Sequence, residues 1–246
     1  MNEKIIEVKN LVAKYGEKTI LNDISIDIYK NEITVILGAS GGGKTTFMKN
    51  LIRLIEPFSG SVKIFGEEVT NMEEEDFNKI LKRTGMLFQN GALLNSIDVF
   101  ENISIPLEQH TKLSPEIRKN IIRKKLDLVN LSHAIYLLPS ELSGGMKKRA
   151  ALARAIALDP DILFFDEPSA GLDPITSANL DELILDLKKQ LNITLIIVTH
   201  ELASIHRIAD KIIFLDKGDI VFHGTLDEVK NSTHPIVKKF FEVGSF

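Results

Sequence analysis

The 246-residue chain is predicted to be an α/β protein, in which strands and helices alternate around a mainly parallel sheet. Short apolar runs of strand length occur at residues 35–37, 162–165 and 194–198. Helical periodicity follows each run, as strand-helix-strand units require. Between residues 90 and 160, helical periodicity takes over from strand-like runs. The chain is therefore predicted to be one domain, residues 1–246, with an α-helical subdomain at residues 90–160 inserted into the α/β core.

The N-terminal part of the chain is predicted to form an antiparallel β-subdomain. Residues 3–9 and 20–28 alternate between apolar and polar side chains, which is typical of strands with one buried face. Tyr15, Gly16 and Glu17 are expected to form the turn between these two strands. Further strands are expected at residues 61–65, 84–88, 212–215 and 220–223.

Start signals place several of the helices. Acidic residues 73–76 suit the first turn of a helix, where they complement its dipole. Ser114 followed by Pro115 starts another helix, since serine caps helices and proline suits the first helical position. The other helices are expected after residue 46 and at residues 143–156, 175–190 and 201–208, with short helices near Leu226 and Pro235.

Composition excludes several classes of function. The net charge is −4, from 30 basic and 34 acidic residues, so no basic surplus indicates nucleic acid as a partner. The absence of cysteine excludes disulfides, cysteine-based zinc sites and thiol catalysis. The N-terminal residues lack the pattern of a signal peptide, and the apolar runs are far shorter than the about 20 residues that span a bilayer. A function at a membrane would therefore need something other than this chain as the anchor.

A glycine-rich sequence after the first parallel strand predicts phosphate binding. The pattern G-x-x-x-x-G-K-T lies between a strand and a helix, which is the context of a phosphate-binding loop. Glycines let backbone N–H groups face a polyphosphate, and the helix N-terminus adds partial positive charge. Lys44 is expected to reach the β- and γ-phosphates, and the Thr45 hydroxyl to bind Mg²⁺. The loop consists of Gly38, Ala39, Ser40, Gly41, Gly42, Gly43, Lys44, Thr45 and Thr46.

Polar residues at the ends of other strands are candidates for catalysis. Asp166 and Glu167 follow a buried strand, at the sheet edge where ligands bind in open α/β folds. Asp166 is expected to hold Mg²⁺ through water, and Glu167 to orient or deprotonate the attacking water. His200 and Gln89 also follow strands, so His200 is a candidate contact for the γ-phosphate and Gln89 for Mg²⁺ or water. The alternative is that these residues only end strands.

A second anion-binding pattern occurs at a later helix start, where Ser143 precedes Gly144 and Gly145. One nucleotide does not readily occupy two such sites of the same chain. A two-fold dimer resolves this, because the serine of each subunit can close on the nucleotide of the other. Without a family resemblance, this sequence would equally describe an ordinary N-capped helix.

These motifs occur in the order and spacing of ATP-binding cassette (ABC) ATPases, which the chain resembles over essentially its whole length. The resemblance implies a P-loop NTPase fold with a RecA-like core, ATP hydrolysis with Mg²⁺, and an ATP-sandwich homodimer. It implies that Tyr15 stacks on adenine, although the residues alone fit a turn residue equally well. It makes residues 38–46 the Walker A loop and Gln89 the lid glutamine. The trans-acting signature is Ser143, Gly144, Gly145 and Met146, the Walker B pair is Asp166 and Glu167, the dimer-crossing loop contains Asp173, and His200 is the switch histidine.

The signature and its flanks resemble one branch of this family. Met146 stands where glutamine is usual, so the side-chain amide and its hydrogen bonds are missing. The sequence L-S-G-G-M-K-K-R-A-A-L-A-R-A, together with residues 88–103 and the C-terminal region, is similar to the ATPase of Mla-type phospholipid-trafficking transporters. That likeness implies a multipass permease, an MCE-domain lipid-binding subunit and, as a further option, a small regulatory subunit as partners.

The likeness also implies a location and a task. The chain would lie peripherally on the cytoplasmic face of the inner membrane of a Gram-negative bacterium, where ATP-driven dimer closure moves phospholipid between the two membranes. Residues 91–105 would face the permease, and each apolar side chain there is equally well explained as contact or core: Leu93, Leu94, Ile97, Val99 and Phe100. The alternatives are a transporter of another solute and a soluble ABC ATPase.

Overall fold

The computed structural model describes residues 3–243, and the chain forms two compact units. The first unit comprises residues 1–81 and 194–246, and the second comprises residues 82–193. The outermost residues of the predicted 1–246 domain, 1–2 and 244–246, lie outside the described part. The predicted helical subdomain at residues 90–160 lies entirely within the second unit.

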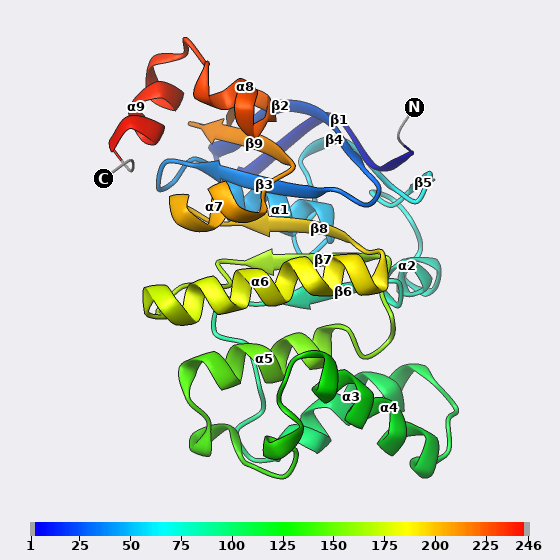
Figure 1. Ribbon diagram of the computed structural model, residues 1–246. Helices are drawn as coiled ribbons and strands as arrows, with labels where there is room; N and C mark the ends of the chain where they lie inside the picture. The colour runs from blue at the N-terminus through cyan, green and yellow to red at the C-terminus, as the bar shows by residue number, and fades with distance from the viewer. Residues whose placement is uncertain (1–2, 244–246) are drawn as a thin grey trace. The chain divides into compact units, whose positions relative to one another are not determined.

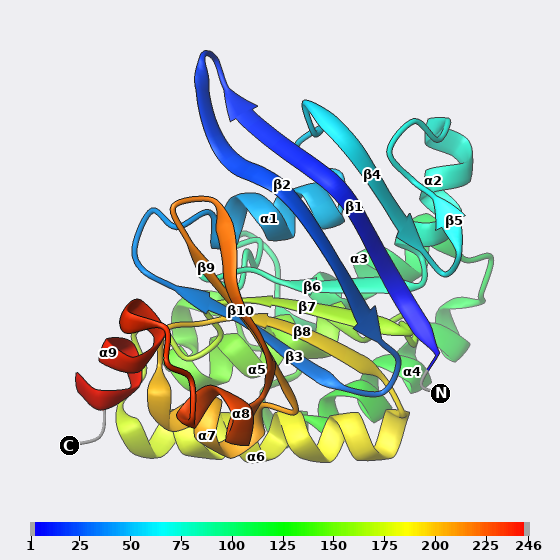
Figure 2. The ribbon, with the colours of Figure 1, turned by 90° about the horizontal axis from the view of Figure 1, so that it is seen from above.

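The first unit contains an antiparallel sheet with the strand order β2-β1-β4-β5 (Figure 2). These strands are β1 (Lys4–Tyr15), β2 (Lys18–Tyr29), β4 (Ser59–Ile64) and β5 (Glu67–Glu68). The alternation predicted the buried face, since Ile24 and Ile28 of β2 are buried and the intervening Ser25 is exposed. The turn at Gly16 and Glu17 joins β1 to β2, as the sequence predicted.

Four strands of the same unit form the order β10-β9-β3-β8. They are β3 (Ile33–Gly38), β8 (Thr194–Val198), β9 (Lys211–Asp216) and β10 (Asp219–Thr225). β3 pairs with β8 and β9 in parallel, and β10 pairs with β9 in antiparallel. Every residue of β3 is buried, including Thr34, which agrees with its mostly apolar sequence. Helix α1 (Lys44–Leu51) contacts β1 and β2 as well as β3 and β8, so its apolar face covers both sheets (Figure 1).

The remaining helices of this unit are α2 (Glu74–Leu81), α7 (Leu202–Ile208), α8 (Leu226–Lys230) and α9 (Pro235–Val243). Helix α8 contacts β9, β10 and α9. The ring of Phe240 on α9 meets Phe214 of β9 edge-on, with 5.3 Å between the ring centroids. The C-terminal helices are thereby attached to the outer strands of the sheet.

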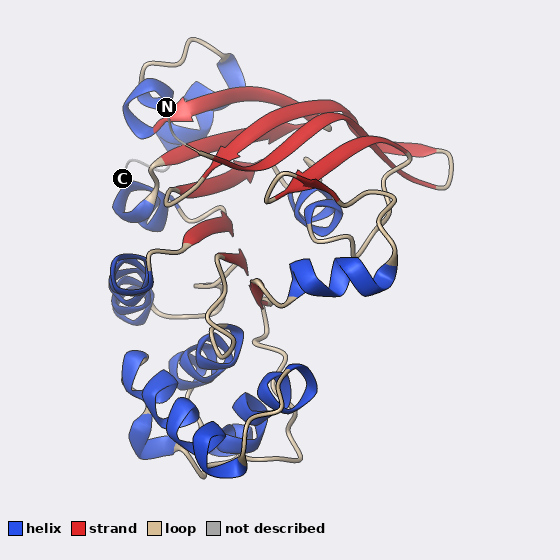
Figure 3. Ribbon diagram, turned by 90° about the vertical axis from the view of Figure 1, so that its right-hand side faces the viewer, coloured by secondary structure: helices blue, strands red, loops and turns tan. Residues whose placement is uncertain are grey.

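The second unit combines two parallel strands with most of the long helices (Figure 3). The strands are β6 (Thr84–Leu87) and β7 (Ile162–Asp166), and the helices are α3 (Val99–His110), α4 (Pro115–Leu128), α5 (Gly144–Ala155) and α6 (Pro174–Leu191), with 3₁₀ turns at Ser132–Ala134 and Pro139–Glu141. Helix α5 contacts α3, α4, α6 and β6, which makes it the centre of this unit. Between residues 90 and 160, all of them described, the ordered elements are helical.

Helix α3 was not predicted as a separate element, although its start carries a clear signal. The Asp98 carboxylate accepts from the Glu101 N–H at 2.8 Å, and the Glu101 carboxylate accepts from the Asp98 N–H at 3.2 Å. This reciprocal arrangement is a capping box, readable as Asp followed three residues later by Glu. Val99 is fully buried and belongs to the core, whereas Leu94 is 51% exposed. Leu93, Ile97 and Phe100 are half-buried.

Candidate nucleotide site

The phosphate-binding loop connects β3 to α1 and depends on glycine geometry. Gly38, Gly41 and Gly43 have φ values of +146°, +76° and +102°, which disfavour residues with a side chain. A Cβ on Gly38 would lie 1.9 Å from the Leu215 carbonyl oxygen, so β9 closes that position. Around Gly41 a Cβ would meet nothing within 4 Å, so the loop is open on this side. The loop is therefore closed by β9 at Gly38 and open at Gly41.

Lys44 is the first residue of α1, and its side chain folds back over the loop. Its Nζ donates to the carbonyl oxygens of Gly38 at 2.8 Å and Ala39 at 3.1 Å. The residue before the helix is Gly43, which has no side chain to cap the first turn. The N–H groups and dipole of an uncapped helix start attract an anion. A loop with this cation, this helix start and the exposed Thr45 hydroxyl fits the phosphates of ATP.

Two other predicted residues lie in the same unit as this loop. His200 is exposed and follows β8, and the N–H of the preceding Thr199 donates to the Ile36 carbonyl of β3 at 3.3 Å. His200 and the loop thus follow the carboxyl ends of neighbouring parallel strands. Tyr15 ends β1 with 51% of its surface exposed, so it is available to a ligand and is not part of the core.

The predicted acidic pair and Gln89 lie together in the second unit. Asp166 ends β7 and Glu167 follows it, both half-buried, while Gln89 is exposed just after β6. β6 and β7 are parallel neighbours, so these three residues occupy one sheet edge. The backbone of Glu167 is left-handed, with φ of +48°. Such a conformation in a residue other than glycine is uncommon and is often found at active sites.

Helix α5 carries the predicted signature at its N-terminus. Ser143 caps the helix, its hydroxyl oxygen accepting from the Met146 N–H at 3.3 Å. A Cβ on Gly145 would lie 2.8 Å from a methyl group of Thr176, so the start of α5 packs closely against the start of α6. Ser143 and Gly144 are exposed, and Met146 is half-buried. The serine and the adjacent backbone are thus accessible to a second molecule.

Asp173 is the N-cap of α6. Its carboxylate accepts from the Thr176 hydroxyl and from the N–H groups of Thr176 and Ile175, at 3.0 and 3.1 Å. These bonds, led by the one from the Thr176 hydroxyl, hold the pKa of Asp173 below its ordinary value of 3.8. The sequence identified this residue only through the family motif and did not predict its capping role.

Lys148 lies in the second unit beside the predicted residues, although no sequence motif predicted it. This lysine of α5 is buried, and its Nζ donates to the carbonyl oxygens of Gln89 and Glu167. The available signal was the helical spacing, since Lys148 lies three and four residues before the apolar Ala151 and Leu152 and so shares their face of the helix.

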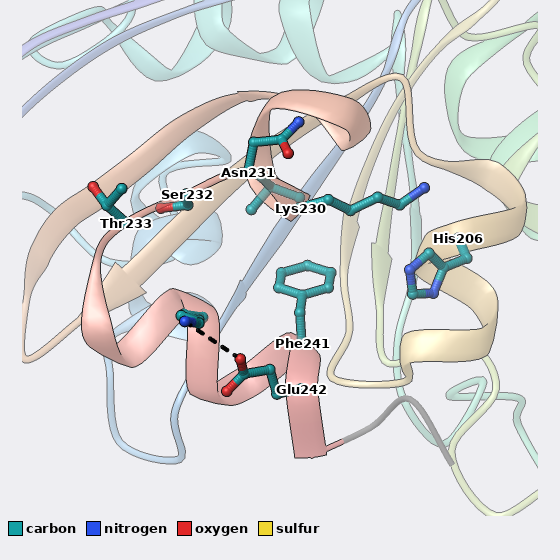
Figure 4. A pocket seen from close by; sticks show the side chains of 9 residues that line it. His206, Lys230, Asn231, Ser232, Thr233, Phe241 and Glu242 are labelled. Carbon is teal, nitrogen blue, oxygen red and sulfur yellow. Dashed lines mark ion pairs between the residues drawn. The ribbon is translucent and has the colours of Figure 1, made fainter.

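The predicted residues thus divide into two groups, one in each unit. Tyr15, residues 38–46 and His200 belong to the first unit, and Gln89, residues 143–146, Asp166, Glu167 and Asp173 belong to the second. A cavity of about 580 Å³ lies elsewhere in the first unit, between α7, α8 and α9 (Figure 4). The ring of Phe241 lies 6.0 Å from that of His206 there, and none of the predicted site residues lines the cavity.

Comparison with known proteins agrees with this arrangement. Residues 21–170 match the family model described as ABC transporter. The intermembrane phospholipid transport system ATP-binding protein MlaF of Haemophilus influenzae is 40% identical, over 98% of this chain and 92% of MlaF. MlaF of Escherichia coli K12 is 38% identical over 97% of this chain and 88% of its own length. The probable ribonucleotide transport ATP-binding protein mkl of Mycobacterium leprae is 39% identical, over 96% of this chain and 68% of mkl.

Solved structures give the same fold. A dimeric post-hydrolysis state of the ATP-binding cassette MJ0796, bound to ADP and Pi, matches with a TM-score of 0.82 at 28% identity, covering 90% of this chain and 99% of that one. CbiO1 from Clostridium perfringens, part of the ABC transporter complex CbiONQ, matches with a TM-score of 0.86 at 27% identity, covering 98% of both chains. These likenesses confirm the predicted fold class. Across residues 3–243, no helix is both long and apolar enough to cross a membrane. The chain belongs to the ABC transporter family and is an ATP-binding ATPase subunit of that family.

Proposed function

We propose that this chain is the ATPase subunit of a transporter that moves phospholipid between the inner and outer membranes of a Gram-negative bacterium. The observation that carries the proposal is the 40% identity to MlaF over nearly the full length of both chains. The likeness to mkl, whose name specifies ribonucleotide transport, is almost as high. A test of the substrate therefore has to include both classes of solute.

Each site residue has a chemical task in this proposal. The loop 38–46 binds the phosphates of ATP, with Lys44 on the β- and γ-phosphates and Tyr15 against adenine. The oxygen donors Thr45, Gln89 and Asp166 are the type that Mg²⁺ prefers, and the bound ion would neutralise phosphate charge. Glu167 orients and deprotonates the attacking water, with His200 on the γ-phosphate.

The reaction requires a second copy of the chain. In the proposed head-to-tail dimer, the exposed Ser143 and the N–H groups of Gly144 and Gly145 contact the ATP held by the other copy, while the Met146 N–H donates to the Ser143 hydroxyl. The dimeric form of the similar MJ0796 cassette supports this arrangement. Backbone N–H groups do not depend on the residue type, so Met146 in place of glutamine remains compatible with phosphate binding.

The dimer would be held at the cytoplasmic face of the inner membrane by a multipass permease. The exposed Leu94 and the half-buried Leu93, Ile97 and Phe100 are the candidate permease contact, whereas Val99 is core. An MCE-domain lipid-binding subunit and a small regulatory subunit complete the proposed assembly.

The test reconstitutes the chain with its permease in proteoliposomes that contain a fluorescent phospholipid. We expect ATP to drive transfer of the phospholipid, and radiolabelled ribonucleotides to remain where they were added. ATP-driven movement of the ribonucleotides without lipid transfer would contradict the substrate and favour the mkl-like alternative.

The same preparation tests the roles of Glu167 and the dimer. Glu167→Gln should bind ATP normally and accumulate as a closed dimer, while ATP hydrolysis falls by about 10²–10⁴-fold, the usual contribution of a general base. Glu182→Gln, at an exposed position of α6, is the matched control and should hydrolyse ATP like the wild type. Hydrolysis by Glu167→Gln at the wild-type rate would show that another group is the base.

A further inference from the structure

Lys148 is a buried cation that touches both segments carrying the proposed catalytic residues of the second unit. Only 6% of the residue is exposed, and its Nζ donates to the carbonyl oxygen of Gln89 and, at 3.4 Å, to that of Glu167. Burial lowers the pKa of Lys148, and the nearby carboxylates of Asp166 and Glu167 partly offset that effect. A charge is retained in such a place only where hydrogen bonds and opposite charges compensate for lost water.

The Glu167 carbonyl lies in a segment whose conformation needs support. With φ of +48°, this residue has a disfavoured left-handed backbone, which persists only when its surroundings hold it. Its carbonyl oxygen accepts from the Ala170 N–H at 3.2 Å, which closes a tight turn, and from Lys148. The backbone of Glu167 determines where its carboxylate points. A contact to that carbonyl therefore bears on the direction of the carboxylate.

Other cations of α5 also bind main-chain carbonyls, but at different places. Arg154 donates to the Gly91 and Ala92 carbonyls, both at 2.9 Å, in the segment that follows Gln89. Arg149 donates to the Val129 carbonyl at 2.9 Å, just after α4. Lys148 differs from both because its partners are Gln89 and Glu167 themselves.

We propose that Lys148 is a positioning residue for ATP hydrolysis, which fixes the main chain of Glu167 and of Gln89 to the signature helix α5. The inference rests on the proposed roles of Glu167 and Gln89. Its ammonium group has three donors, so one side chain can hold both carbonyls at once. Since Ser143 caps the same helix, a shift of α5 moves the signature and the support of Glu167 together. The residue couples signature contact to catalytic geometry without touching the substrate.

The experiment measures ATPase kinetics of the full chain in complex with its permease. Lys148→Met keeps an apolar stem and loses the donors, so we expect kcat to fall by about a hundredfold, as for a misplaced catalytic group. The KM and the Kd for ATP should stay within about twofold, because the phosphate-binding loop is unchanged. Lys148→Arg keeps charge and donors and should recover most of the lost kcat.

Arg149→Met is the matched control, because it removes a neighbouring cation-to-carbonyl bond of the same helix that reaches neither catalytic segment. We expect Arg149→Met to keep kcat within about twofold of the wild type, even if both variants lower the melting temperature by a similar amount. Equal losses of kcat in both variants, or no rescue by arginine, would reduce Lys148 to a general stabiliser and overturn the proposal. If Lys148→Met does not fold, Lys148→Leu, which also lacks the donors, is judged by the same criteria.

Glu167→Gln is measured in parallel to separate the two proposals. Loss of hydrolysis in Glu167→Gln with full activity in Lys148→Met would refute only the role of Lys148. Full activity in Glu167→Gln would refute the proposal that Glu167 is the catalytic base. The positioning role of Lys148, which rests on that proposal, would then fail as well.

Discussion

The carboxylate of Asp173 accepts a hydrogen bond from the hydroxyl of Thr176, three residues further along the chain. The methyl group of the same threonine is what a side chain on Gly145 would strike, at 2.8 Å. One side chain therefore links the cap of α6 to the start of the signature helix α5. Because Asp173 is also the proposed dimer-crossing residue, the site depends on how firmly this cap is held.

The cap at Asp173 predicts a pH dependence of stability. Its pKa is lower in the folded chain than the ordinary 3.8, so the stabilisation is present above about pH 4 and is lost as the pH falls through the folded value. Asp173→Ala should lower the urea midpoint at pH 7, and the difference from wild type should shrink in acid. Asp173→Asn, a good cap without a titrating proton, is the control and should not show this change with pH. Equal midpoints for wild type and Asp173→Ala at pH 7 would contradict the cap.

Alanine substitutions at Gly38 and Gly41, two glycines of the same loop, should differ in how much folding stability they cost. Both have positive φ, but a Cβ at Gly38 would meet the Leu215 carbonyl at 1.9 Å, whereas at Gly41 the space is empty. Gly41→Ala should cost only about 1–2 kcal/mol, the penalty of a left-handed conformation. Gly38→Ala should cost more than about 4 kcal/mol or prevent folding, because β3 and β9 must separate. Denaturant unfolding of both variants checks this, and similar losses would contradict the close approach of Leu215.

The effect of replacing Lys44 should show how much this residue of the loop contributes to catalysis. Its hydrogen bonds to the carbonyl oxygens of Gly38 and Ala39 hold the ammonium group over the loop, where we propose that the phosphates bind. Lys44→Ala should lower kcat/KM for ATP by about 10²–10³-fold, or about 2.7–4 kcal/mol, as for the loss of one transition-state donor. Lys49→Ala, in the last turn of the same helix, is the control and should leave kcat/KM near wild type. Steady-state ATPase assays of both variants check this prediction. Equal losses of kcat/KM in the two variants would contradict the proposed role of Lys44.

Ser143 caps α5 and is also proposed to contact the ATP of the partner, and one substitution can separate the cap from the proposed contact. Its hydroxyl caps α5 through the Met146 N–H, and aspartate is an equally good cap. Ser143→Asp should therefore keep the melting temperature while its negative charge repels the phosphates of the partner's ATP and abolishes hydrolysis. Ser143→Ala should instead lose about 1 kcal/mol of stability with a smaller loss of activity. Full activity of Ser143→Asp in the permease complex would exclude this serine from the phosphate contact.

Local sequence patterns predicted much of the fold because their signals are short in range. The apolar run at residues 162–165 is β7, and Ser114 with Pro115 starts α4. The alternation at residues 20–28 correctly predicted a strand with one buried face. Helix α3 was not predicted separately, because its start lies in a segment rich in apolar residues and only the capping box of Asp98 and Glu101 indicates it.

The sequence by itself determined the residue types of the site, because phosphate binding needs glycines and a lysine at fixed spacing and catalysis needs acids at a strand end. Only the tertiary structure decided which residues hold these groups in place. Lys148, 59 residues from Gln89 and 19 from Glu167, reaches both through the packing of α5, and Leu215 closes on Gly38 from a distant strand. No local pattern encodes such contacts, because they arise from folding chain segments that are far apart in sequence.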